Sequence, residues 1–237
     1  MKPTSIRTHG ARSSSGLSSA GRAQERAFDL LDKIGLDKKD TEGYRLRTDG
    51  NGRLRVEITT VAAAFLPWAQ QMEMVAQQWK KIGIQVDVKD TERNLAVTRN
   101  QNNETQIYIW GAGTEDLFLF PRHELPVEPI EPFTGPLYAK WYATAGAAGT
   151  KPTDPDLLKA MDLLRSGAGV EETERMQIGK QIRQLIVDNQ WVIGTVGFVP
   201  NVRVIGTKMG NVPERISWKS RCRTPGATHP STYYMKA

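Results

Sequence analysis

The 237-residue chain has one cysteine, three histidines and no long apolar run. A single cysteine, Cys222, excludes an internal disulfide bond, and we expect an inert thiol in a solvated tail. No stretch approaches the roughly 18 apolar residues of a membrane-spanning helix, so we predict that the chain does not span a membrane. The histidines have no metal-ligating partners at the usual spacing, which predicts no metal site.

Motifs of enzymes are scarce as well. A phosphate-binding loop, a nucleophile elbow and a complete dinucleotide fingerprint are absent from the sequence, so we predict neither a cofactor nor catalysis. Glu115 and Asp116 are adjacent acids, and they leave a carboxylate-dependent hydrolase as an alternative. Two adjacent acids in a loop are more often a solvated turn, so we favour a non-enzymatic protein.

The formal charge of +6 is concentrated at the two ends of the chain. Nine of the 32 basic residues lie in residues 1–22 and 215–237, where there are no acids, so residues 23–214 carry 23 basic and 26 acidic residues, a net charge of −3. A nucleic-acid-binding domain would place its basic residues on a folded face with aromatic residues between them. We therefore predict no nucleic-acid partner.

The clearest local pattern is a helix that ends on a glycine and passes into a strand. Apolar residues recur at spacings of three and four between Met72 and Ile82, which predicts an amphipathic helix. Gly83 suits the left-handed conformation that ends many helices. Residues 54–58 and 84–88 alternate apolar and polar side chains, as half-buried strands do. Strand, helix and strand together predict a parallel unit and an α/β fold.

The remaining pattern divides the chain into a tail and further elements. Residues 1–22 are rich in serine and poor in large apolar side chains, which predicts a disordered or non-native tail. Further helices are predicted over 23–34, 92–103 and 171–189, and from a cap at Thr153–Asp156 through Leu164. Further strands are predicted over 106–110, 191–199 and 202–205, and the strand at 106–110 is apolar enough for the centre of a sheet.

The segment from Trp110 to Tyr142 differs in composition from the rest of the chain. It holds seven of the 18 aromatic residues and five prolines, which predicts an ordered but irregular segment. Open α/β sheets bind ligands beyond the carboxyl ends of their strands, where this segment begins. We expect most of its rings to pack on the core and one or two to face a ligand.

These elements resemble a known family in their order and spacing. The matching pieces are Leu30–Leu36, Tyr44–Arg47, Val75–Val86, the strand that ends in Trp110, Phe65–Pro67, Phe118–Pro121, Gly135–Tyr138 and Met209–Pro213. They are similar to the C-terminal half of the family 5 extracellular solute-binding proteins, which serve peptide/nickel-type ABC importers. The resemblance extends from about Ala23 to the C-terminus.

The resemblance implies a periplasmic-binding-protein-like (type II) fold, in which two α/β lobes close over a ligand. Residues 23–190 resemble the second lobe, a mixed sheet flanked by helices, and residues 191–237 resemble a segment that returns to the first lobe. The bulk of the first lobe and an export signal would lie outside this sequence. The family implies a periplasmic location and an ABC permease as the membrane partner.

The resemblance also implies a ligand site at the end of the strand that leads to Trp110. The expected ligand-binding residues are Trp110, Gly111, Ala112, Gly113, Thr114 and Asp116. Peptide binders of the family carry an aspartate for the ligand amine three residues after the tryptophan, where this chain has Gly113. Asp116 resembles a second acid found later in that loop.

The ligand that we expect is an oligopeptide or another polar oligomeric solute, and an oligosaccharide stacked on Trp110 stays open. One lobe alone buries too little of a ligand, so we expect weak binding or none by this chain. The leading alternative is a stand-alone α/β protein-interaction module that pairs through open strands such as Val202–Ile205.

Overall fold

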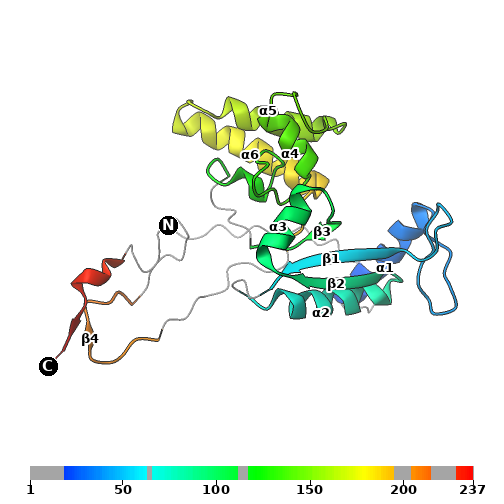
Figure 1. Ribbon diagram of the computed structural model, residues 1–237, viewed down its shortest axis with the longest axis horizontal. Coiled ribbons are helices and arrows are strands. Elements are labelled where there is room, and N and C mark those ends of the chain that lie inside the picture. Colours follow the sequence, from blue (N-terminus) through cyan, green and yellow to red (C-terminus); the bar gives the residue numbers. More distant parts are fainter. Residues whose placement is uncertain (1–18, 63–65, 112–116, 195–203, 215–227, 237) are drawn as a thin grey trace. The chain divides into compact units, whose positions relative to one another are not determined.

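The computed structural model describes residues 19–62, 66–111, 117–194, 204–214 and 228–236. The chain divides into two compact units (Figure 1). Unit 1 runs to Ala96 and includes Thr105–Ile109, and unit 2 comprises Val97–Glu104 and the chain from Trp110 onward. The first helix begins at Ser19, inside the segment predicted to lack structure.

Unit 1 is built on a three-stranded parallel sheet with the order β2-β1-β3. The strands are β1 (Arg55–Val61), β2 (Gln85–Thr91) and β3 (Ile107–Tyr108). Parallel pairing of β1 with β2 over seven residues confirms the predicted strand–helix–strand unit and the α/β fold. The expectation of a central third strand is wrong for the described residues, because β3 lies at the edge and β1 is central.

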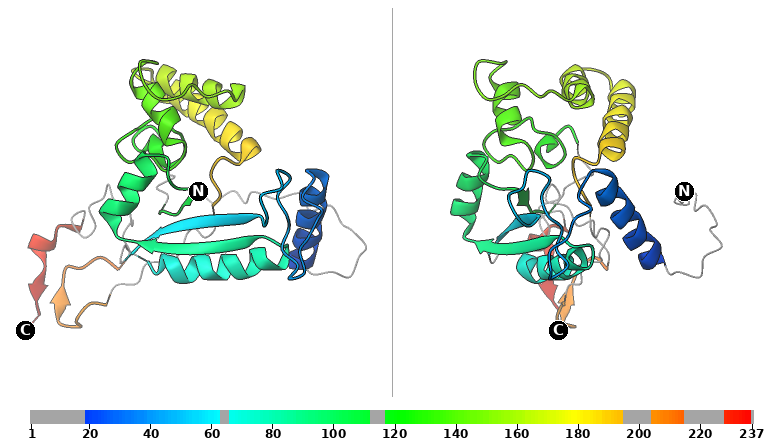
Figure 2. Two further views of the ribbon diagram at one scale, coloured as in Figure 1. Left: turned by 45° about the vertical axis from the view of Figure 1, so that its right-hand side comes forward. Right: turned by 90° about the vertical axis from the view of Figure 1, so that its right-hand side faces the viewer.

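Helix α2 (Trp68–Lys81) connects β1 to β2 and runs along one face of the sheet (Figure 2). It ends as the sequence predicts, since Gly83 has a φ of +87°. The Gly83 carbonyl accepts a hydrogen bond from the Arg45 N–H at 2.7 Å. The Arg45 side chain is fully buried and donates from Nε to the Ile82 carbonyl at 2.8 Å. Arg45 therefore ties the end of α2 to the turn region before β1.

Arg45 also contacts the first helix of the unit, α1 (Ser19–Lys33). Its guanidinium forms an ion pair with Asp32 and lies over the Phe28 ring, 5.5 Å from the centroid. Gly35 follows α1 with a φ of +85°, as its place after the helix predicts. One buried cation thus holds two helix ends of unit 1.

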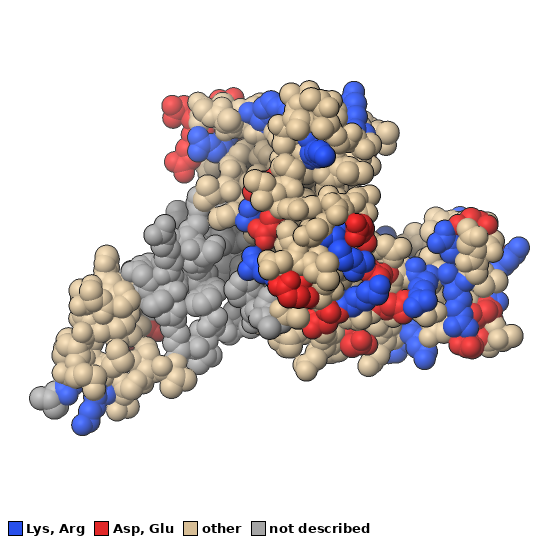
Figure 3. All heavy atoms as spheres, in the orientation of Figure 1, with Lys and Arg blue, Asp and Glu red and all other residues tan. Residues whose placement is uncertain are grey.

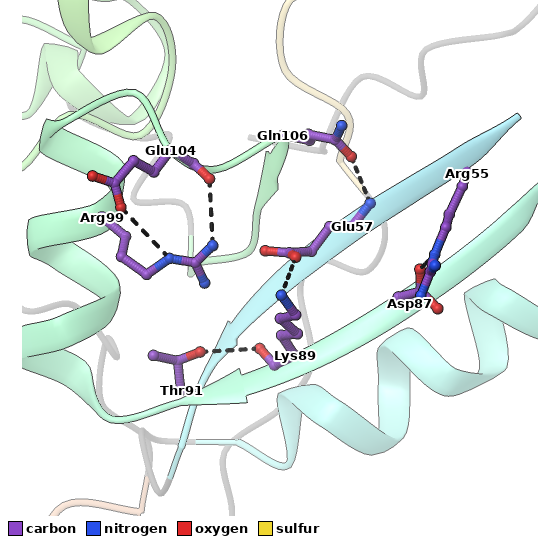
Figure 4. A network of polar contacts seen from close by, with 8 residues as sticks. All are labelled: Arg55, Glu57, Asp87, Lys89, Thr91, Arg99, Glu104 and Gln106. Carbon is purple, nitrogen blue, oxygen red and sulfur yellow. Dashed lines mark hydrogen bonds and ion pairs between the residues drawn. The ribbon is translucent and has the colours of Figure 1, made fainter. Parts of the chain in front are cut away.

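In the sheet of unit 1, ion pairs join side chains of the neighbouring strands β1 and β2 (Figure 4). Arg55 pairs with Asp87, and Lys89 Nζ lies 2.5 Å from a carboxylate oxygen of Glu57. The Gln106 side chain accepts a hydrogen bond from the Glu57 N–H at 2.7 Å, which extends the contact between β1 and the chain before β3. Acidic and basic side chains are interspersed over the strands and turn region of unit 1 on the face shown in Figure 3.

Unit 2 is mainly helical. Its helices are α4 (Pro136–Ala143), α5 (Pro155–Ser166) and α6 (Glu172–Asn189), with a 3₁₀ turn, η1, at Pro121–His123. Helix α3 (Arg93–Gln101) begins in unit 1, and its last residues belong to unit 2. The core of unit 2 consists of Leu117, Leu125, Val127, Leu157, Ala160, Met161, Ile178, Ile182 and Ile186.

Two features of unit 2 depart from the sequence prediction. The predicted strand at 191–199 is absent over its described part, residues 191–194, and the described end of the 202–205 strand, Val204 and Ile205, is also not in a strand. The other residues of both predicted strands lie outside the described ranges. Near the C-terminus, β4 (Met209–Gly210) and β5 (Tyr234–Met235) form an antiparallel ribbon, with the 3₁₀ turn η3 (Pro230–Thr232) before β5.

Candidate functional site

The candidate site is built around Trp110, which follows β3 along the chain. Hydrogen bonding to β1 continues up to Ile109, the residue before Trp110, because the Ile109 N–H donates to the Thr59 carbonyl at 3.2 Å. The Trp110 indole stacks on Phe133 with the ring centroids 5.6 Å apart and the planes inclined by 25°. Trp110 is half-buried in this arrangement, so the residue keeps part of its surface accessible to solvent.

Two further rings, those of His123 and Phe120, extend this contact within unit 2. His123 lies 4.9 Å from Phe133 in a tilted arrangement, and Phe120 stacks on His123 at 5.9 Å. We call Trp110, Phe133, His123 and Phe120 the aromatic platform. Ring contacts of this kind stabilise flat surfaces beyond the area that they bury. The platform therefore presents Trp110 with its partners already in place.

The cation beside the platform is neutralised by two acids. Arg122 lies over Phe120, 5.7 Å from the ring centroid. Its guanidinium nitrogens lie 2.8 Å from a Glu128 oxygen and 3.3 Å from a Glu131 oxygen. Because Arg122 has these partners, it holds the loop together and is poorly placed to bind an anionic ligand.

The loop that carries Phe133 is attached to the end of α3 by two side-chain amides. Asn100 donates to the carbonyl of Pro132, and Gln101 donates to the carbonyl of Ile130. Asn100 is only 4% exposed. Sequence reasoning missed both residues, although two amides in the last turn of a weakly amphipathic helix are a signal for such a contact.

A buried acid lies between the platform and the helical core. Glu124 follows η1 and is 6% exposed, and Arg183 on α6 lies 3.4 Å from its carboxylate. Burial raises the pKa of Glu124, and the Arg183 charge offsets this in part by lowering it. The pair connects η1 to α6 and thereby fixes the loop next to His123.

The structure brings only part of the predicted site into view. Trp110 and the exposed Gly111 are described. The other predicted ligand-binding residues are Ala112, Gly113, Thr114 and Asp116, and they lie outside the described residues together with Glu115. The platform partners Phe120, His123 and Phe133 were not singled out as site residues by the sequence.

No three His, Cys, Asp or Glu side chains in the described ranges lie close enough together to hold one metal ion. Among the described helices none is long and apolar enough to cross a bilayer.

Residues 9–118 match a family model described as "Bacterial extracellular solute-binding proteins, family 5 Middle". This match confirms the resemblance to family 5 that the sequence indicates. It begins inside the predicted tail and ends within the segment that follows Trp110. No curated protein sequence matches the chain.

Solved structures show the same fold. The oligopeptide-binding protein OppA is 24% identical with a TM-score of 0.66, and the match covers 92% of this chain and 37% of OppA. MelB from Agrobacterium fabrum, solved in complex with stachyose, is 17% identical with a TM-score of 0.58 over 71% of this chain and 25% of MelB. NikA from Brucella suis, in complex with Fe(III)-EDTA, is 21% identical with a TM-score of 0.50 over 69% of this chain and 30% of NikA.

The chain therefore spans well under half of the length of the structures that it matches. Their similarity confirms a periplasmic-binding-protein-like fold.

Proposed function

We propose that this chain, which carries the family 5 match, is part of the substrate-binding component of an ABC importer. The observation that supports the proposal most strongly is the match of residues 9–118 to the family model. Members of such a family bind a solute and do not transform it, so we infer a non-enzymatic role. The partners would be a polar solute and a membrane permease, and the location would be periplasmic.

We assign residues 23–190 to one lobe and residues 191–237 to a segment that returns toward a first lobe. Closure of two lobes over a ligand would be the signal that the permease recognises. This chain corresponds to 37% of OppA, so the opposing lobe would come from sequence outside it.

The ligand contact that we propose is the exposed part of the Trp110 indole. Phe133 supports the indole at 5.6 Å, which reduces the entropy that ordering this side chain would cost on binding. Backbone N–H groups of residues 111–114 would donate hydrogen bonds to the ligand. A flat apolar surface beside backbone donors suits a polar oligomer with carbonyl or hydroxyl groups.

Two ligand classes are consistent with this contact. OppA is named for oligopeptides, and an oligopeptide is our first candidate. The Arg122 pairs with Glu128 and Glu131 favour a neutral ligand, because they leave this cation without a strong need for an anionic partner. MelB was solved with stachyose, so a neutral oligosaccharide is the second candidate.

A titration of the chain labelled with ¹⁵N at its tryptophans tests the proposal. Penta-alanine and stachyose are the probes, and the indole N–H resonance of Trp110 is assigned by its loss in Trp110→Leu. We expect one probe to shift this resonance with millimolar affinity, since one lobe encloses little of the ligand. Trp141→Leu, which changes a half-buried tryptophan on α4, should keep the response.

Two results would contradict the proposal. If a probe binds the chain and leaves the Trp110 resonance unmoved, the proposed contact is wrong. If the isolated chain binds a probe with micromolar affinity or better, an opposing lobe is not needed for binding.

A further inference from the structure

We infer that Asn100 is a positioning residue for Trp110, and that it acts through the loop that carries Phe133. The inference rests on the proposed role of Trp110 in binding. All of these residues belong to unit 2, and the contacts between them form one continuous path. The path runs from the Asn100 amide to the Pro132 carbonyl, to the neighbouring Phe133 ring, and to the Trp110 indole.

The loop before Phe133 depends on donors from outside itself. Pro129 and Pro132 have no backbone N–H, so this stretch has few donors of its own. Carbonyl groups that are buried need a partner. The amides of Asn100 and Gln101 supply donors to the carbonyls of Pro132 and Ile130, and these two acceptors lie on either side of Glu131.

Burial makes the Asn100 contact the more restrictive of the two. Asn100 is 4% exposed and Pro132 is also buried, so water cannot readily replace the amide. Gln101 reaches a carbonyl of Ile130, whose side chain is exposed, and loss of that hydrogen bond can be repaired by solvent. The position of Phe133 is therefore fixed mainly through Asn100.

The residue type supports this role. Asparagine is a poor helix former because its side chain competes for backbone hydrogen bonds, and position 100 lies in the last turn of α3. A contact outside the helix explains its presence there. Because Phe133 also contacts His123 at 4.9 Å, a displaced loop would disturb both ring contacts of the platform.

The test needs no ligand, so its outcome is independent of whether the proposed function holds. The full chain is labelled with ¹⁵N at its tryptophans, and Asn100→Asp removes the amide donor with little change in size. We expect the Trp110 indole resonance to shift, because Phe133 no longer shields the ring. For the same reason, we expect the quenching of Trp110 fluorescence by acrylamide to rise about twofold or more. The indole resonances of Trp68 and Trp79 in α2 should stay in place.

Asn102→Asp is the matched control. Asn102 is exposed near the end of the same helix, and its amide contacts Glu104 at 3.3 Å rather than the loop. It should leave the Trp110 resonance unchanged. In Asn100→Asp, return of the resonance toward its original position in acid would support the positioning role further, because the introduced carboxyl group then regains a proton to donate.

Three outcomes would overturn the inference. The first is an unmoved Trp110 resonance in folded Asn100→Asp, and the second is an equal shift of every indole resonance. If Asn100→Asp does not fold, Asn100→Ser serves instead, because a serine hydroxyl is shorter than the amide and removes the donor that reaches the Pro132 carbonyl. An unmoved Trp110 resonance in folded Asn100→Ser is the third.

Discussion

Replacement of Gly83 by alanine should destabilise unit 1 through two separable effects. Gly83 has a φ of +87°, and an L residue in the left-handed region costs about 1–2 kcal/mol. A Cβ atom at this position would lie 2.9 Å from Arg45 Cγ and 3.0 Å from the Gly43 carbonyl oxygen. Crowding of a packed site costs about 1–3 kcal/mol more. The expected loss in the free energy of unfolding is therefore about 2–5 kcal/mol.

The crowding cannot be relieved cheaply, because Arg45 has no room to move. Its side chain is fully buried, and its Nε donates to Ile82 at 2.8 Å while the guanidinium pairs with Asp32. A shift of the side chain away from a new methyl group would break contacts with both helix ends. We therefore expect the loss to lie above the cost of backbone strain alone.

Gly50→Ala is the matched control, since Gly50 has a φ of +80° and a Cβ there would meet no atom within 4 Å. It isolates the backbone cost of about 1–2 kcal/mol. Peptide-resolved hydrogen exchange of β1 measures both variants within unit 1. Protection in Gly83→Ala should fall by about 30-fold or more, because each 1.4 kcal/mol corresponds to a factor of about ten. Equal losses in the two variants would refute the argument that Gly83 is required by the close approach of Arg45.

Three further predictions concern unit 2. Because burial raises the pKa of Glu124, the folded chain binds this proton more tightly than the unfolded chain, so this group's contribution to the free energy of unfolding should fall as the pH rises above 4.5. Urea titrations at several pH values give the free energy of unfolding as a function of pH, and Glu124→Gln should remove the Glu124 part of this dependence. If the free energy of unfolding changes with pH as steeply in Glu124→Gln as in the unaltered chain, burial of Glu124 is not the cause. Asp154→Ala should cost about 1 kcal/mol in urea unfolding, because Asp154 caps α5. It also accepts a hydrogen bond from Trp191 Nε1 at 3.1 Å, so an unchanged Trp191 resonance would contradict this contact. Ile182→Ala should lower the free energy of unfolding by about 2–5 kcal/mol in the same assay, since Ile182 is 0% exposed. A loss below about 1 kcal/mol would show that the surrounding core closes the cavity left by the substitution.

Local signals in the sequence predicted the helices of this chain well. The end of α2 at Gly83 and the cap of α5 at Asp154 depend on residues within one turn of the helix end, so the pattern contains the whole cause. The eight-residue helix α4 was missed because prolines are dense around it. Pro136 lies at its first position, where a helix accepts proline without loss of a hydrogen bond.

Features that depend on distant residues could not be predicted in the same way. The apolar composition around β3 indicates burial but not its place at the edge of the sheet formed by the described residues, which depends on which strand pairs with β1. Trp191 was predicted to begin a strand, yet its indole donates to Asp154 far back in the sequence. For the site, the family resemblance implied Trp110, and its role in binding stays a prediction. The contact of Trp110 with Phe133 and the hydrogen bond from Asn100 to the Pro132 carbonyl are tertiary contacts, which the local pattern does not contain.

The proposed function depends on a contact between Trp110 and a polar oligomer. Saturation-transfer difference NMR on the full chain with stachyose and with penta-alanine tests it most directly, because the method detects weak binding from the probe's own signals. We expect a transfer signal from at least one probe that is lost in Trp110→Leu and kept in Trp141→Leu. A transfer signal of equal strength in the unaltered chain and in Trp110→Leu would contradict this contact.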